Sequence, residues 1–154
     1  MSNIRTRVAV VSDLESIALL FDAYRQFYGK SSDLDLATTF IRDRIQKGES
    51  VILLALGGDQ QVIGFCQLYP TFCSVEARPI FALYDLFVAP HARRSGAGRA
   101  LLVAAEALAT VKGMARMDLT TAKTNRPAQA AYESLGWIRD EVFHAYSRRL
   151  EVPA

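Results

Sequence analysis

Residues 80–102 read IFALYDLFVAPHARRSGAGRALL, and the fold is organised around this stretch. It opens with an apolar run from Ile80 to Val88 that is interrupted by one charge, at Asp85. Such a run is typical of a strand that is buried on both faces. Pro90 ends the strand, because proline has no N–H to donate to a neighbouring strand. From Leu101 onward apolar residues recur every three or four positions, which predicts a helix.

Between this strand and this helix lies a short basic loop that is rich in glycine. Its residues are Arg93, Arg94, Ser95, Gly96, Ala97 and Gly98. Glycine lets a backbone approach a ligand closely, and the N–H groups of a helix's first turn have no partner within the helix. The helix dipole also favours a negative charge at this end. The loop therefore predicts an anion-binding site, and a phosphate is the expected anion.

The spacing within the loop separates three kinds of phosphate-binding loop. A dinucleotide fingerprint requires a small residue where this chain has Leu101, and an ATP-type loop requires Gly-Lys-Ser/Thr, which is absent. What fits is Arg93-x-x-Gly96-x-Gly98, preceded by Val88-x-Pro90. This pattern resembles the acetyl-CoA loop of the GNAT superfamily of N-acetyltransferases.

A second motif downstream supports the same resemblance. It reads Asn125-x-x-Ala128-x-x-x-Tyr132-x-x-x-Gly136-Trp137, and it is similar to the second signature of the superfamily in content, order and distance from the loop. The runs DLFVAP at 85–90 and FHAYS at 143–147 also look similar to the spermidine/spermine and diamine acetyltransferase branch. The resemblance implies a single α/β domain over residues 1–154. In the GNAT-type fold, a mixed, mostly antiparallel central sheet of six to seven strands is flanked by four helices.

Composition is consistent with one globular domain. Of the 154 residues 51% are hydrophobic and 22% are charged, and the net charge of +2 argues against a nucleic-acid partner. The apolar run Val51–Leu56 is too short to span a membrane, and the first thirty residues contain no signal-peptide core. Cys66 and Cys73 make neither a metal-binding spacing nor a disulfide framework, so we expect no metal and a cytoplasmic protein.

The order of the expected elements is that of an α/β protein with hairpins and crossovers. Strands are expected over residues 4–10, 50–56, 61–69, 80–88 and 116–121, with one or two more within 137–150. A hairpin turn is expected at 57–60 and a loop at 70–79. Helices are expected from a capping box at Ser12 and Glu15 to residue 28, over 36–45 before Gly48, from the glycine loop to about 112, and from Asn125 to Gly136.

The resemblance also implies how acetyl-CoA is held. Backbone N–H groups and cations of the loop face the pyrophosphate, and the strand before it pairs with the extended pantetheine arm. A backbone N–H near Leu86 and Phe87 stabilises the oxygen of the thioester carbonyl. Tyr132 takes the position of the general acid, and Asn125 that of a contact to the cofactor arm. The implied cofactor-binding residues are Leu86, Phe87, Val88, Arg93, Arg94, Ser95, Gly96, Ala97, Gly98, Arg99, Asn125 and Tyr132.

The position before Asp85 departs from the polyamine-type relatives, in which a glutamate serves as the base. In this chain the position holds Tyr84, and a phenol with a pKa of about 10 is a poor base at neutral pH. Asp85 has either a structural purpose or the role of receiving a cationic acceptor. The proton of the amine passes to Asp85, to a water chain, or to solvent before binding; the short reach of an aspartate favours the last two. The expected acceptor pocket is lined by Tyr24, Tyr28, Phe72 and Tyr84, whose ring faces receive a cation.

Together these features predict an acetyl-CoA-dependent N-acetyltransferase. It acts on a primary amine of a small molecule, and the amine attacks the thioester directly in a ternary complex. A protein-lysine acetyltransferase and a non-catalytic acetyl-CoA-binding module are the alternatives; Tyr132 and Asn125 speak against the second. The resemblance to the polyamine-type branch implies a homodimer, and no membrane partner is expected.

Overall fold

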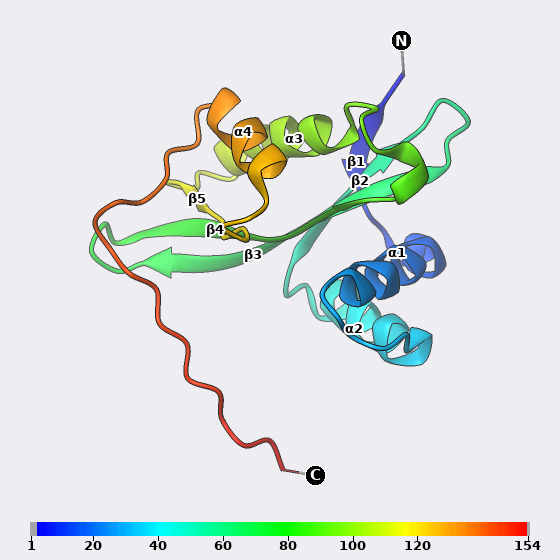
Figure 1. Cartoon of the computed structure of the whole chain (residues 1–154), viewed down its shortest axis with the longest axis horizontal. Helices are drawn as coiled ribbons and strands as arrows, with labels where there is room; N and C mark the ends of the chain where they lie inside the picture. Colours follow the sequence, from blue (N-terminus) through cyan, green and yellow to red (C-terminus); the bar gives the residue numbers. More distant parts are fainter. Residues whose placement is uncertain (1–2, 154) are drawn as a thin grey trace. The chain divides into compact units, whose positions relative to one another are not determined.

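The computed structural model describes residues 3–153 of the chain. They fall into two compact units, Met1–Thr120 and Thr121–Ala154. The first unit holds a sheet and three helices, and the second holds one helix, α4, and an extended carboxy-terminal segment (Figure 1). Each unit has its own local structure, and one domain over residues 1–154 stays a prediction.

The elements of the first unit alternate as expected for an α/β protein. In chain order they are β1 Arg5–Val8, the 3-10 turn η1 Val11–Asp13, α1 Leu14–Phe27, α2 Leu34–Lys47, β2 Val51–Leu56, β3 Val62–Cys73, β4 Arg78–Val88, the 3-10 turn η2 Pro90–Ala92, α3 Ala97–Val111 and β5 Met117–Asp118. The second unit contributes α4, Arg126–Ser134. Gly48 ends α2 in the left-handed conformation, as expected of a C-cap glycine.

The sheet has the order β1-β2-β3-β4-β5, antiparallel except for the parallel pair of β4 and β5. The α/β class, the mixed and mostly antiparallel sheet and the four helices are confirmed. The number of strands is not: the described residues form five strands, where six to seven were predicted. The difference lies in residues 137–153, which form no strand. Near their start the Asp140 carboxylate accepts hydrogen bonds from the N–H groups of Val142 and Phe143, and this local turn competes with strand pairing.

The helices of the first unit cover both faces of the sheet, α1 and α2 on one and α3 on the other (Figure 1). The core under α1 and α2 contains Ile17, Leu20, Phe21, Ala37, Ile41, Ile52, Leu54, Leu56, Phe65, Phe87 and Ala89. Gly64 on β3 lets α3 approach, because a Cβ there would lie 3.0 Å from the Phe87 carbonyl oxygen and 3.4 Å from Leu101 Cδ1. This close packing fixes the start of α3 beside the end of β4.

Two local predictions are wrong. The helix α1 begins without a side-chain cap, and Ser12 and Glu15 form no capping box. The carboxylate of its N-cap residue, Asp13, instead accepts hydrogen bonds from the Arg7 guanidinium at 2.8 Å and from the N–H of Val10 at 2.8 Å.

The predicted loop over residues 70–79 is a hairpin, because β3 runs on to Cys73 and β4 begins at Arg78. Pro70 is tolerated inside β3 since the pairing with β2 reaches only to Leu68, so no strand on that side needs its missing N–H. The strand β5 is also shorter than predicted.

Candidate active site

The glycine loop lies where β4 passes into α3. Arg94 and Gly96 both have left-handed backbone, with φ of 63° and 91°, and the Ser95 hydroxyl accepts a hydrogen bond from the N–H of Ala97 at 3.3 Å. Gly96 is the N-cap residue of α3, whose fifteen residues give it a full dipole. The loop thus presents the start of a long helix to any ligand that carries negative charge.

The two glycines have different reasons to be there. Gly96 needs its left-handed φ of 91°, which L side chains rarely adopt. Gly98 is helical, and a Cβ on it would meet only Val88 Cγ2, at an ordinary contact distance of 3.8 Å. The fold itself does not require glycine at position 98. The absence of a side chain there leaves the helix start accessible, as the close approach of a pyrophosphate demands, so the loop fits acetyl-CoA.

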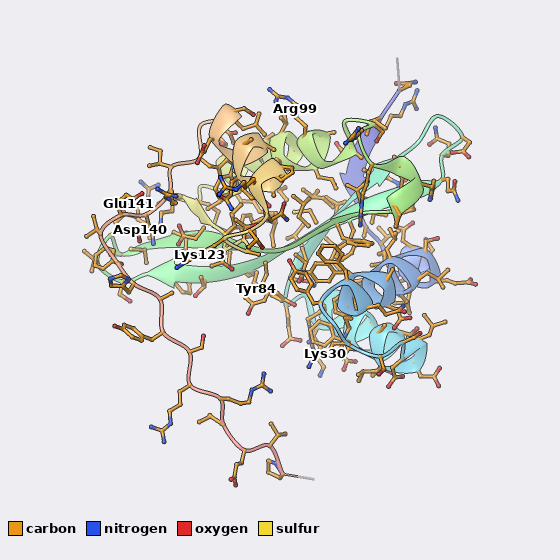
Figure 2. The ribbon with its side chains drawn as sticks, viewed as in Figure 1. Lys30, Tyr84, Arg99, Lys123, Asp140 and Glu141 are labelled. Carbon is orange, nitrogen blue, oxygen red and sulfur yellow. The ribbon has the colours of Figure 1, made fainter. Side chains whose placement is uncertain are left out.

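Arg93 is held by the end of β4. Its Nε donates to the Val88 carbonyl oxygen at 3.2 Å, and its guanidinium lies 5.7 Å from the Phe27 ring and 5.5 Å from the Phe87 ring. Arg94 and Arg99 are exposed at the loop and at the first turn of α3. Figure 2 shows Arg99 extending from α3 on the side away from the sheet.

Beyond Ala82, β4 has an open edge in the first unit. The strand β5 pairs only with Phe81 and Ala82, so no described strand pairs with Leu83 to Val88 on this side. The N–H of Ala89 donates to the Ile63 carbonyl at 2.8 Å. In an antiparallel pair every second residue of β4 then has its N–H and C=O directed at β3, and the residues between have theirs directed away from it. Phe87 therefore faces β3, whereas the backbone groups of Leu86 and Val88 face the open edge. An extended amide chain fits this edge as an added strand would.

A β-bulge interrupts β4 just before this edge. Gln67 on β3 is opposite Asp85, but the next residue, Leu68, is opposite Leu83, so Tyr84 is the extra residue. Its side chain is 71% exposed, and its ring lies 5.6 Å from that of Tyr69. Figure 2 shows Tyr84 on the side of the sheet that carries α1 and α2.

Asp85, next to the bulge, belongs to a chain of hydrogen bonds. Its carboxylate accepts from Gln67 Nε2 at 2.8 Å and from the hydroxyl of Tyr24. Gln67 Oε1 in turn accepts from the Ser50 hydroxyl at 2.7 Å. Burial raises the pKa of the Asp85 carboxyl, and the hydrogen bonds from Gln67 and Tyr24 oppose that rise.

Sequence reasoning missed Gln67 and Ser50 as members of this chain. The available signal was a polar residue, Gln67, inside the apolar run VIGFCQLY at 62–69. A buried amide needs partners, but the sequence alone does not say that its partner is Asp85, eighteen residues away.

The predicted acceptor residues are only partly brought together. The Tyr24 ring packs edge-on against Tyr28 at 5.1 Å and Phe87 at 5.7 Å, and Tyr24 also interacts electrostatically with Tyr84. Phe72 is 75% exposed near the tip of the β3–β4 hairpin. At about 3.3 Å per residue, it lies roughly 16 Å along β3 from Gln67. The structure therefore separates Phe72 from the three tyrosines.

The remaining predicted residues lie in the second unit. Asn125 is the N-cap of α4, and its Oδ1 accepts from the N–H of Ala128 at 3.3 Å. The Tyr132 ring lies 6.1 Å from that of Trp137. The roles of Asn125 and Tyr132 toward the cofactor stay predictions.

The sequence profile of the Acetyltransferase (GNAT) family matches residues 17–137. The chain belongs to the GNAT family. It is 47% identical over 148 residues to an uncharacterized N-acetyltransferase, YhfO, of Bacillus subtilis (strain 168), which covers 96% of this chain and 97% of the relative. The GNAT fold is also that of a crystal structure of a probable acetyltransferase, with a TM-score of 0.90, 36% identity, and coverage of 97% of this chain and 99% of the other.

A more distant structure shares the fold alone. It is an aminoglycoside acetyltransferase, meta-AAC0020, from an uncultured soil metagenomic sample, with a TM-score of 0.76, 20% identity, and coverage of 96% and 97% of the two chains. These relatives establish a GNAT N-acetyltransferase that uses acetyl-CoA, and they give no support to the polyamine-type branch. Within residues 3–153, no helix has the length and apolarity needed to cross a membrane. The same residues contain no group of three or more His, Cys, Asp or Glu side chains placed to hold a metal ion.

Proposed function

We propose that this GNAT enzyme acetylates a primary amine of a small molecule, and that the amine attacks the thioester directly while both substrates are bound. The observation that carries the proposal is the place of the open β4 edge. The backbone groups of Leu86 and the N–H of Val88 face outward for the donor, and Asp85 and Tyr84 precede them directly on the same strand. A donor arm on this edge ends beside the one buried carboxylate of β4.

The surroundings of that carboxylate suit a cationic acceptor. Tyr24 interacts with Asp85, its ring contacts that of Tyr28, and it also interacts with Tyr84. Aromatic faces attract ammonium groups within about 6 Å of the ring centre. A negative charge behind aromatic rings attracts a small ammonium ion to those rings and disfavours an anionic acceptor. The exposed Tyr84 at the bulge marks the outer side of this pocket.

Neither cysteine is suited to carry the acetyl group, which supports direct attack. Cys66 is buried on β3, and burial raises the pKa of its thiol far above neutral pH. Cys73 lies at the tip of the β3–β4 hairpin, with its Sγ 3.4 Å from Arg116 Nη1. At about 3.3 Å per residue it lies roughly 20 Å along β3 from Gln67, too far to take part.

Each part of the chain then has one task. Bound acetyl-CoA supplies the acyl group and a thiolate leaving group. The loop from Gly96 to Gly98 holds the pyrophosphate at the start of α3. Because Phe87 faces β3, the N–H of Leu86 is the group placed to stabilise negative charge on the carbonyl oxygen. Tyr132, by family resemblance, gives a proton to the leaving sulfur.

A thiol-release assay tests the proposal. Acetyl-CoA is offered with polyamines, diamines, amino acids, aminoglycosides and lysine peptides, and we expect turnover with a small primary amine. Tyr132→Phe should lower turnover about a hundredfold or more while leaving the affinity for CoA unchanged. Turnover of lysine peptides alone would make this a protein acetyltransferase. Binding of CoA without turnover of any amine would make it a binding module.

A further inference from the structure

We propose that Tyr24 and Asp85 together are the base that deprotonates the acceptor amine, and that Gln67, fixed by Ser50, positions Asp85 for this task. This inference rests on the proposed function, because it names the group that makes the amine nucleophilic. An alkyl ammonium has a pKa near about 10, so an enzyme working near neutral pH gains rate by removing its proton. An aspartate on a strand has little reach, and Tyr24 supplies the missing distance.

An acceptor gains access to the buried pair through Tyr24. Asp85 is 6% exposed and Gln67 is 0% exposed, so an acceptor does not reach either of them directly. Tyr24 is partly exposed on α1, and its hydroxyl is hydrogen-bonded to the Asp85 carboxylate. Its ring packs edge-on against Phe87, 5.7 Å between centroids, beside the open edge of β4. Of the two hydrogen-bond partners of Asp85, Tyr24 alone connects the carboxylate to the acceptor side.

Tyr24 and Gln67, the two partners of Asp85, differ in their chemistry. A phenol donates one hydrogen bond and accepts others at the same oxygen, so it passes a proton on as it receives one. A primary amide has no titratable proton at neutral pH. Because Gln67 Oε1 accepts from Ser50 at 2.7 Å, Gln67 Nε2 is turned toward Asp85 at 2.8 Å and donates to it. This orientation favours the ionised, proton-accepting form of Asp85.

The electrostatic environment shifts the pKa of both Asp85 and Tyr24. Burial raises the pKa of Asp85, which makes it a stronger base than an exposed aspartate, while Gln67 and Tyr24 limit the rise. Burial and the charge of Asp85 raise the pKa of Tyr24, so its phenol stays protonated and remains a donor. The titratable and charged groups around the pair are Cys66, Tyr69, Tyr28 and Tyr84, with Arg44 of α2 and Glu49 acting on Tyr69.

The proton balance is complete. The acceptor ammonium gives one proton to the Tyr24 oxygen while the phenol proton of Tyr24 passes to the Asp85 carboxylate. A cation and an anion in the pocket are thereby replaced by a neutral amine and a neutral acid, which is favourable where water is excluded. The free amine forms the new N–C bond as the C–S bond breaks, and its second proton ends on the sulfur. Asp85 then returns its proton through Tyr24 to solvent.

Kinetics of three variants test the pair. Tyr24→Phe and Asp85→Asn should each lower kcat/KM about a hundredfold at pH 7 with the best amine of the panel, and much less near pH 10, where that amine is largely neutral. With a β,β,β-trifluorinated analogue, which is weakly basic and mostly unprotonated at pH 7, both variants should approach the wild-type rate. Gln67→Leu removes a donor from the carboxylate, so the acidic limb of the pH profile should move to higher pH. Thr110→Val, which removes a hydroxyl that donates only to the Glu106 carbonyl within α3, is the control and should keep the wild-type profile.

A titration without any substrate separates this inference from the proposed function. Carbon-13 NMR of labelled aspartate follows the ionisation of Asp85 in the free protein. Tyr24→Phe and Gln67→Leu should each raise its pKa, whereas Thr110→Val on α3 should not. An Asp85 resonance that ignores Tyr24→Phe, or equal losses with the alkyl amine and its fluorinated analogue, would overturn the pair even if amine acetylation is observed. If the panel finds no amine substrate, the proposed function fails by itself, and with it the catalytic use of this pair.

Discussion

Asp85 brings a carboxylate into the sheet, where only 6% of the residue is exposed to solvent. Two neutral donors, Gln67 and Tyr24, replace part of the missing solvation. Hydrogen bonds of this kind contribute about 1.5–3 kcal/mol each when the acceptor is charged, whereas burying an ion costs several kcal/mol. The raised pKa of Asp85 shows that the cost exceeds the gain. Because the buried charge of Asp85 lowers stability, its presence is better explained by a role in function.

This imbalance predicts how stability depends on pH. Because the pKa of Asp85 is higher in the folded chain than in the unfolded one, its contribution to stability is complete below the unfolded pKa of about 3.9 and is lost as pH rises through the folded value. Asp85→Asn keeps an acceptor for Gln67 and removes the charge. The variant should therefore gain free energy of unfolding over wild type between pH 4 and pH 8, by about 1.4 kcal/mol for each unit of pKa elevation. Urea unfolding at pH 4, 6 and 8 measures this; a difference that does not change with pH would contradict it.

The sequence left the purpose of Asp85 open for a physical reason. A buried carboxylate in an apolar run requires hydrogen-bond or charge partners. Which partners it finds depends on the register between β3 and β4, and the bulge at Tyr84 shifts that register by one residue. Bulges have no reliable sequence signal, so the pairing of Asp85 with Gln67 could be seen only in the structure.

At the scale of elements, local chemistry predicted most of the fold. The hairpin at residues 57–60, the Gly48 end of α2 and the start of α4 at Asn125 each depend on the conformation of one or two residues, and all three are found. The lengths of β3, β4 and β5 depend on neighbouring strands, and their predicted bounds differ from those in the structure. The end of β5 at Asp118 is the most consequential of them, because it opens the edge of β4.

The unit formed by β4, the glycine loop and α3 makes a prediction that separates folding from binding. Gly98→Ala adds a methyl group that meets only Val88 Cγ2 at 3.8 Å, and alanine in a helix is favoured over glycine by up to about 1 kcal/mol. The variant should melt at the same temperature as wild type or higher, yet bind CoA at least about tenfold more weakly, since the methyl group blocks the approach of a phosphate. Calorimetric titration with CoA and thermal unfolding measure the two effects.

Gly96→Ala is the matched comparison for this experiment. Its left-handed φ of 91° makes any side chain unfavourable, by about 1–2 kcal/mol for the backbone alone. It should lose stability as well as CoA affinity, so the two glycines should differ in thermal unfolding. Unchanged CoA affinity in a folded Gly98→Ala protein would show that this loop does not bind the pyrophosphate.

At the scale of the whole molecule, the carboxy-terminal segment carries an unusual number of exposed apolar side chains. Those exposed by more than 70% are Ile138, Val142, Phe143, Tyr146, Leu150 and Val152. Single exposed apolar residues are common, whereas several of them along one short segment are typical of an interaction surface. A second copy of the chain is the partner that we expect on this surface.

The protein is accordingly predicted to be a homodimer whose interface includes residues 142–146. Phe143 and Tyr146 are the expected anchors, because buried aromatic residues dominate interface energies and cost about 2 kcal/mol or more when lost. Replacing both by aspartate should weaken the dimer by about a thousandfold if the two effects add, since each 1.4 kcal/mol is a factor of about ten. Light scattering at micromolar concentration should then report a dimer for wild type and a monomer for the double variant. Val111→Asp, at an equally exposed valine at the end of α3, is the control and should stay dimeric. A wild-type monomer under these conditions would end the prediction, and a dimer that ignores both substitutions would move the interface elsewhere.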